Sequence, residues 1–133
     1  MIDRYTLPEM GNLWTDAYKL QTWLQVEIAV CEAQAELGYI PAEAVEEIKA
    51  KANFDPQRVL EIEAEVHHDM IAFLTNVNEY VGDAGRYIHL GLTSSDVLDT
   101  ALALQLVASI DTLLKRVESL IQALRYQAQE HRN

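Results

Sequence analysis

Small hydroxyl residues stand where the last helix of this chain is expected to begin, in the segment His89-Leu-Gly-Leu-Thr-Ser-Ser-Asp96. The first turn of a helix has unpaired N–H groups and a partial positive charge. The hydroxyls of Thr93 and Ser94 add donors, and Gly91 allows the backbone to turn tightly. This arrangement suits a carboxylate or phosphate. The chemistry alone nevertheless favours the simpler alternative, an ordinary capping box in which a Ser or Thr caps the helix and nothing binds.

A second polar cluster is His67-His68-Asp69. Adjacent histidines on a helix point about 100° apart, so they do not normally share one metal ion. One histidine oriented by a carboxylate could instead donate a proton or face an anionic ligand. The residues alone favour a solvated helix cap, with Asp69 as the capping residue.

Three further residues are weaker candidates. His89 precedes the hydroxyl segment and could contribute to the same site. Arg4 is one of few arginines and could clamp a phosphate, with Tyr5 beside it. Composition alone would leave Arg4 and Tyr5 as surface residues.

The composition restricts the class of protein. The chain has 133 residues, half of them apolar, so one packed core is expected. Its net charge of −11 argues against a general nucleic-acid binder and against attraction to anionic membranes. Cys31 is alone, which excludes a disulfide within the chain, and it fits a small buried side chain. We expect no membrane-spanning run and a cytoplasmic protein.

Periodicity and capping signals predict an all-α fold. The expected helices begin after Thr15 or Asp16, at Ala42, at Asp55-Pro56, at Met70 and near Ser94. Their expected ends are near residues 37, 52, 64 and 81, and the last helix continues to the end of the chain. Residues 1–14 are expected to be irregular and residues 87–92 short and extended. We expect residues 1–92 to form a domain of short helices and residues 93–133 to begin a long-helix bundle.

The last helix carries an apolar seam with steps of three and four residues, typical of helices that pair. The seam is Ala103, Leu106, Ile110, Leu113, Val117, Leu120 and Leu124, and a second stripe is Val107, Leu114 and Ile121. The short helices upstream cannot cover both stripes along a helix of roughly 50 Å. We therefore expect further chain or another subunit to cover them, and we expect the sequence to be part of a longer protein. The alternative is a complete small protein whose helix frays.

The segment Gly91-Leu-Thr-Ser-Ser-Asp-Val-Leu-Asp-Thr100 resembles a signature of the fumarase/aspartase superfamily. Within that superfamily, the whole chain is most similar to the N-terminal part of the adenylosuccinate lyase family. The supporting motifs are Arg4-Tyr5 with Pro8-Glu9-Met10, Trp23-Leu-Gln-Val-Glu27, His68-Asp69 with Ala72-Phe73, and Arg86-Tyr-Ile-His89.

The resemblance implies a lyase that eliminates fumarate from adenylosuccinate and from succinyl-carboxamide ribotide, in a homotetramer whose active sites combine several subunits. Arg4 and Tyr5 would bind the nucleotide, chiefly its phosphate, and Thr93 and Ser94 a succinyl carboxylate. His89 would lie near the phosphate.

The resemblance also implies that His68 and Asp69 would contact the substrate. The family's principal acid, a histidine, and its base, a loop serine, lie downstream. His68 would therefore support the chemistry, with the role of acid as the alternative. His67 stands where a more basic residue is common, so its contribution to the phosphate side is weaker. No metal or redox cofactor is implied, since acid–base catalysis with anion stabilisation suffices for this elimination.

Two alternatives remain at this stage. One is another member of the superfamily, such as a carboxymuconate cycloisomerase, which shares the 91–100 segment. The other is a helical oligomerisation module without chemistry, which the seam on the last helix supports.

Overall fold

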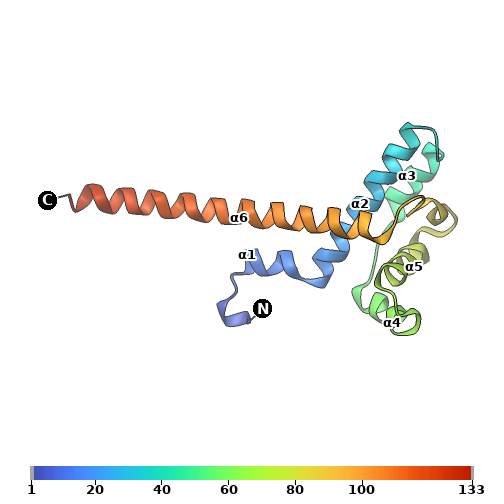
Figure 1. Ribbon diagram of the computed structural model, residues 1–133, viewed down its shortest axis with the longest axis horizontal. Coiled ribbons are helices and arrows are strands. Elements are labelled where there is room, and N and C mark those ends of the chain that lie inside the picture. Colours follow the sequence, from blue (N-terminus) through green and yellow to red (C-terminus); the bar gives the residue numbers. More distant parts are fainter. Residues whose placement is uncertain (1, 133) are drawn as a thin grey trace.

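The computed structural model describes residues 2–132 and is built almost entirely from helices (Figure 1). The described residues include no strand, which confirms the predicted all-α class. The α-helices are α1 (Pro8–Gly11), α2 (Asp16–Glu36), α3 (Ala42–Lys51), α4 (Pro56–Val66), α5 (Asp69–Val81) and α6 (Ser94–Glu130). Three 3₁₀ helices complete the order: η1 (Asp3–Tyr5), η2 (Asn12–Trp14) and η3 (Gly82–Tyr87).

The helix starts follow the capping signals in the sequence. The Thr15 hydroxyl accepts from the Tyr18 N–H at 3.2 Å at the start of α2. The Asp55 carboxylate accepts from the Gln57 N–H at 2.9 Å, with Pro56 in the first turn of α4. These bonds satisfy amides that have no partner within the helix. The predicted starts near residues 16, 42, 56 and 94 are thereby confirmed.

Two predicted segments differ from the structure. Residues 3–14 are not irregular but form three successive helical turns, η1, α1 and η2, with Pro8 opening α1. The approach to α6 is not extended: η3 ends at Tyr87 and a tight turn follows, in which His89 and Gly91 have φ of 66° and 74°. A chain that must reverse within a few residues needs such left-handed positions.

The core lies between α2, α3, α4, α5 and η3. Phe73 on α5 is fully buried and meets the Trp23 ring edge-on at 5.5 Å between ring centroids. Asn76 is the polar link of this core. Its side chain accepts from the Asp55 N–H at 2.8 Å and donates to Glu79 at 3.0 Å, which ties the start of α4 to α5.

Helix α6 packs on α2 only through its first turns and then extends well beyond the other helices (Figure 1). Its buried face consists of Val97, Ala101, Gln105 and Ser109. Gln105 donates to the Leu13 carbonyl at 2.9 Å and fixes η2 against α6. The apolar seam points elsewhere, and its leucines, isoleucine and valine are all between 46% and 59% exposed. The expectation that the upstream helices cannot cover the seam is confirmed.

The expectation of no membrane-spanning run needs correction, because α6 is long and apolar enough to cross a bilayer by length and composition. It carries Asp99 and Asp111, and its first turns pack on α2. Alternating apolar and polar positions around a helix are typical of a contact with protein rather than with lipid. We therefore interpret the exposed apolar residues of α6 as a protein-contact surface.

Candidate functional site

The side chain of Asp96 takes part in a capping box at the start of α6. The Thr93 N–H and hydroxyl donate to the same Asp96 oxygen at 2.7 and 3.0 Å. These bonds to Thr93 lower the pKa of the Asp96 carboxyl, which therefore stays ionised at the positive end of the helix. The chain by itself thus shows the capping-box alternative. The hydroxyls of Ser94 and Ser95 bond to no other described residue, so they can still donate to a ligand.

The turn before Thr93 is held by one face of α2. Glu27, Cys31 and Gln34, spaced four and three residues apart, all contact this turn. The Gln34 amide donates to the Leu90 carbonyl at 2.7 Å, and the Cys31 thiol lies 3.7 Å from the Tyr87 carbonyl. Contacts one and two helical turns apart fix both the position and the direction of a short loop.

Glu27 makes the strongest of these contacts. Its carboxylate is 1% exposed, and its two oxygens lie 2.6 Å from His89 Nδ1 and 2.9 Å from the His89 backbone nitrogen. Burial raises the pKa of Glu27, and the bonds from His89 oppose that rise. Sequence reasoning included Glu27 in a family motif but missed this role. The available signal was a carboxylate in line with Leu20, Leu24 and Cys31 on the buried face of a helix.

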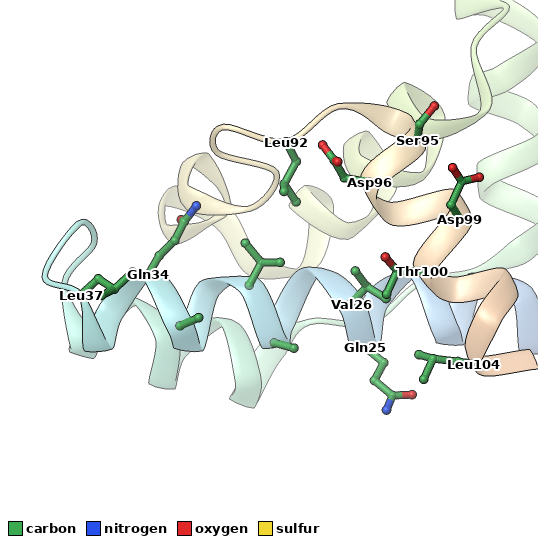
Figure 2. Close-up of a pocket in the computed structure, with 13 residues that line it drawn as sticks. Gln25, Val26, Gln34, Leu37, Leu92, Ser95, Asp96, Asp99, Thr100 and Leu104 are labelled. Carbon is green, nitrogen blue, oxygen red and sulfur yellow. The ribbon is translucent and has the colours of Figure 1, made fainter. Parts of the chain in front are cut away.

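An open groove of about 730 Å³ runs between α2 and the first turns of α6 (Figure 2). Val26, Leu37, Leu92 and Leu104 are among the apolar residues that line it. Asp96 and Asp99 come from α6 and are the ionisable residues of its lining. A groove with apolar walls and two carboxylates disfavours an anion, so it is not suited to a nucleotide phosphate.

The pair His68-Asp69 lies at the junction of α4 and α5. His68, not Asp69, is the capping residue of α5, and Asp69 is its first helical residue, which corrects the sequence-based assignment. His68 Nδ1 accepts from the Ile71 N–H at 3.4 Å and lies 3.5 Å from Asp69 Oδ1. Nδ1 accepts from Ile71 only when it carries no proton, whereas an ion pair with Asp69 requires a proton on Nδ1. The two long contacts therefore cannot both form at the same time. His67 closes α4 in a left-handed conformation, with φ of 54°.

Arg4 and Tyr5 lie beside the middle of α6. The Arg4 guanidinium stacks over the Tyr5 ring at 4.7 Å from its centroid, and both side chains are exposed. Tyr5 shares a small cavity of about 210 Å³ with Leu113 and Arg116 of α6. Arg116 is paired with Glu9 on α1.

The predicted site residues therefore fall into three groups. His89, Thr93 and Ser94 are together at the start of α6, and His67, His68 and Asp69 are at the junction of α4 and α5. Arg4 and Tyr5 are displaced along α6 by about 19 residues from Ser94, or roughly 28 Å at 1.5 Å per residue. A single small ligand cannot bridge that distance within one chain. The described residues also contain no cluster of three or more metal-ligating side chains.

Comparison with known proteins gives one family. A family model described as "Lyase" matches residues 3–133. The chain is 85% identical over 132 residues to the adenylosuccinate lyase of Synechocystis sp. and 47% identical to that of Bacillus subtilis. Both alignments cover 99% of this chain but only 31% of the relative, so the chain spans about a third of the length of these proteins.

A solved structure of similar fold is the 3-carboxy-cis,cis-muconate lactonizing enzyme from Pseudomonas putida. It superposes with a TM-score of 0.85 at 32% identity, covering 98% of this chain and 32% of that one. The helical arrangement is therefore shared between proteins whose names indicate different reactions, and the fold alone does not choose between them.

Proposed function

The chain belongs to the lyase family that matches residues 3–133, and on this premise we propose that it forms the N-terminal part of an adenylosuccinate lyase. The observation that carries the proposal is the 85% identity with the adenylosuccinate lyase of Synechocystis sp. over 132 residues. The complete enzyme would release fumarate from adenylosuccinate and from succinyl-carboxamide ribotide, in purine biosynthesis in the cytoplasm.

The reaction is a β-elimination, and its proton transfers define what this part of the enzyme must supply. A base removes a proton from the succinyl group, the carbon–nitrogen bond breaks, and an acid protonates the leaving nitrogen. We assign the principal acid and base to residues outside this chain. The role of this chain is to bind the substrate anions, with Thr93 and Ser94 at a succinyl carboxylate and His68 in support of the chemistry.

The phosphate end of the substrate would be bound by Arg4, Tyr5 and His89, with a weaker contribution from His67. Arg4 is exposed and, among the described residues, pairs with no carboxylate, so its guanidinium can accept a phosphate in two-point contact. His89 contributes a ring held by Glu27 beside Thr93.

The separation of roughly 28 Å between Arg4-Tyr5 and Thr93-Ser94 along α6 supports an active site shared between subunits. The 37 residues of α6 span about 55 Å, and its exposed apolar stripes provide the surface on which other subunits would pack. We propose a homotetramer on this basis. Asp69 would complete each site by contacting the substrate next to His68.

Identity favours the adenylosuccinate reaction over the carboxymuconate one. The lactonizing enzyme is 32% identical to this chain, whereas the two adenylosuccinate lyases are 85% and 47% identical. The chain also carries Arg4 for a phosphate, a group that carboxymuconate does not have.

The proposal is tested by Arg4→Ala in the complete enzyme. Losing a charged two-point contact raises the KM for adenylosuccinate about tenfold or more while kcat changes little. Arg132→Ala, at the far end of the chain, serves as the control and leaves both constants unchanged. An unchanged KM in Arg4→Ala would contradict the phosphate role.

The assignment of the chemistry to other parts of the enzyme has its own test. The 133-residue chain is expected to release no fumarate from adenylosuccinate, because it lacks the principal acid and base. Turnover clearly above the blank would refute that assignment.

A further inference from the structure

The carboxylate of Glu27 makes two contacts with His89, and together they bear on the position of the proton on the His89 ring. Glu27 bonds two groups of the same residue, the ring Nδ1 at 2.6 Å and the backbone N–H at 2.9 Å. The backbone N–H can only donate, so the Glu27 oxygen that it contacts is the acceptor of that bond. When Glu27 is ionised, as the two bonds from His89 favour, its second oxygen is an acceptor too. Nδ1 then bonds that oxygen at 2.6 Å by carrying a proton.

The other ring nitrogen of His89 faces outward. Nε2 makes no hydrogen bond to any described residue, and it is not among the buried polar atoms that lack a partner. The His89 side chain is 20% exposed, while Glu27 on its other side is 1% exposed. Nε2 is therefore the ring atom that a ligand beside Thr93 can reach.

We propose that Glu27 is a positioning residue that keeps a proton on His89 Nδ1 and turns Nε2 towards the ligand. The neutral ring then presents a bare lone pair at Nε2, which repels an anion. Only the ring with both nitrogens protonated donates from Nε2, so binding of a phosphate-type anion at His89 takes up one proton. This inference rests on the proposed function for the identity of the anion, but not for the position of the ring proton.

The backbone conformation supports the same role. His89 has φ of 66°, a region that non-glycine residues seldom occupy. The bond from its N–H to Glu27 helps to hold this conformation, together with the Gln34 amide on the Leu90 carbonyl. One carboxylate thus fixes both the backbone and the ring of the residue two positions before Gly91.

Two other titratable groups are electrostatically coupled to this pair. Cys31 on α2 is buried, and burial raises the pKa of its thiol to about 11, so it is neutral at physiological pH. Asp96 on α6 is ionised and coupled to His89. Neither replaces Glu27, because neither is hydrogen-bonded to His89 Nδ1.

Glu27→Gln is an informative variant because it preserves the shape and reverses one bond. The glutamine oxygen can still accept from the His89 N–H. Its NH₂ group then faces Nδ1 and can only donate, which moves the ring proton to Nε2. The matched control is Glu32→Gln, which removes the same charge from the same helix at a half-buried residue paired with Lys49.

The proton position is measured by long-range ¹H–¹⁵N correlation of the chain labelled at its four histidines, with His89→Gln to assign the signals. We expect His89 to show a proton on Nδ1 alone or on both nitrogens in the wild type and in Glu32→Gln. We expect Glu27→Gln to show the Nε2–H form at alkaline pH. A wild-type spectrum with Nε2–H and a bare Nδ1 would overturn the proposal, whatever the variants do.

The consequence for binding is measured in the complete enzyme by the pH dependence of KM. The wild-type KM for adenylosuccinate is expected to rise about tenfold as His89 loses its second proton, and that of Glu27→Gln less than about threefold. Parallel profiles would contradict the proton-coupled binding. If the enzyme proves inactive on adenylosuccinate, the proposed function fails while the ¹⁵N result still decides the role of Glu27.

Discussion

The exposed seam of α6 gives a quantitative prediction about assembly. Leu113 and Leu120 are 55% and 58% exposed, so roughly half of each side chain remains to be buried by a partner. Full burial of a leucine contributes about 2 kcal/mol, so these two residues contribute about 2 kcal/mol per subunit. A contact between two subunits then loses about 4 kcal/mol when both leucines become glutamate, which weakens association roughly a thousandfold.

The assay is sedimentation velocity of the complete enzyme over a range of concentrations. Leu113→Glu with Leu120→Glu is expected to dissociate at concentrations where the wild type remains assembled, because carboxylates in an apolar interface add a desolvation cost. The control, Ser119→Glu with Gln122→Glu, adds the same charges at exposed polar positions of α6 and leaves assembly intact. An assembled Leu113/Leu120 variant would refute the role of the seam.

Three further predictions concern the stability and reactivity of the fold. Phe73→Ala is expected to lower the free energy of unfolding by about 3–5 kcal/mol in urea titrations, whereas Ile71→Ala, 49% exposed on the same helix, lowers it far less; equal losses would contradict the assigned core. Cys31, buried and with its pKa raised to about 11, is expected to react with a thiol reagent at pH 8 only after unfolding, and rapid labelling of the folded chain would be the contrary result. Folding lowers the pKa of the Asp96 carboxyl, so the ionised Asp96 stabilises the folded chain above its unfolded pKa near 3.8. This stabilisation is lost as the pH falls through the folded pKa. Asp96→Asn should therefore lose less stability on acidification than the wild type, and identical acid profiles would count against the capping bonds.

The sequence predicts those parts of this fold that depend on local chemistry. Thr15, Asp55 and Pro56 are visible as helix starts because capping involves residues only a few positions apart. The apolar seam of α6 is visible because its period is regular. The order of the helices and the exposure of the seam follow from these signals.

The sequence does not predict features that depend on contacts across the fold. Glu27 and His89 are 62 residues apart, and only the packing of the loop on α2 brings them together. The buried face of α6 contains Gln105, which pattern reasoning would place at the surface, because the carbonyl that it binds belongs to Leu13. His68 takes the capping role expected of Asp69, because the left-handed turn at His67 ends α4 and α5 then begins at Asp69, one residue earlier than expected.

In the candidate site too, the local features are predictable from the sequence and the long-range contacts are not. The Thr93-Ser94 segment is identifiable from the sequence and stands at the start of a long helix, as expected. Its hydrogen bonds to Asp96 show that the cap and the anion site are alternatives only for Thr93, since the hydroxyls of Ser94 and Ser95 bond to no other described residue. The distance to Arg4 and Tyr5 could not be anticipated, because residues 2–14 fold back along α6 (Figure 1).

We propose that this chain is part of an enzyme that eliminates fumarate from adenylosuccinate. The most direct measurement is fumarate formation by the complete enzyme, supplied in parallel with adenylosuccinate and with 3-carboxymuconate. We expect fumarate from adenylosuccinate, its loss when Thr93 and Ser94 are both replaced by alanine, and no conversion of carboxymuconate. Conversion of carboxymuconate without any fumarate from adenylosuccinate would show that the enzyme catalyses a different reaction.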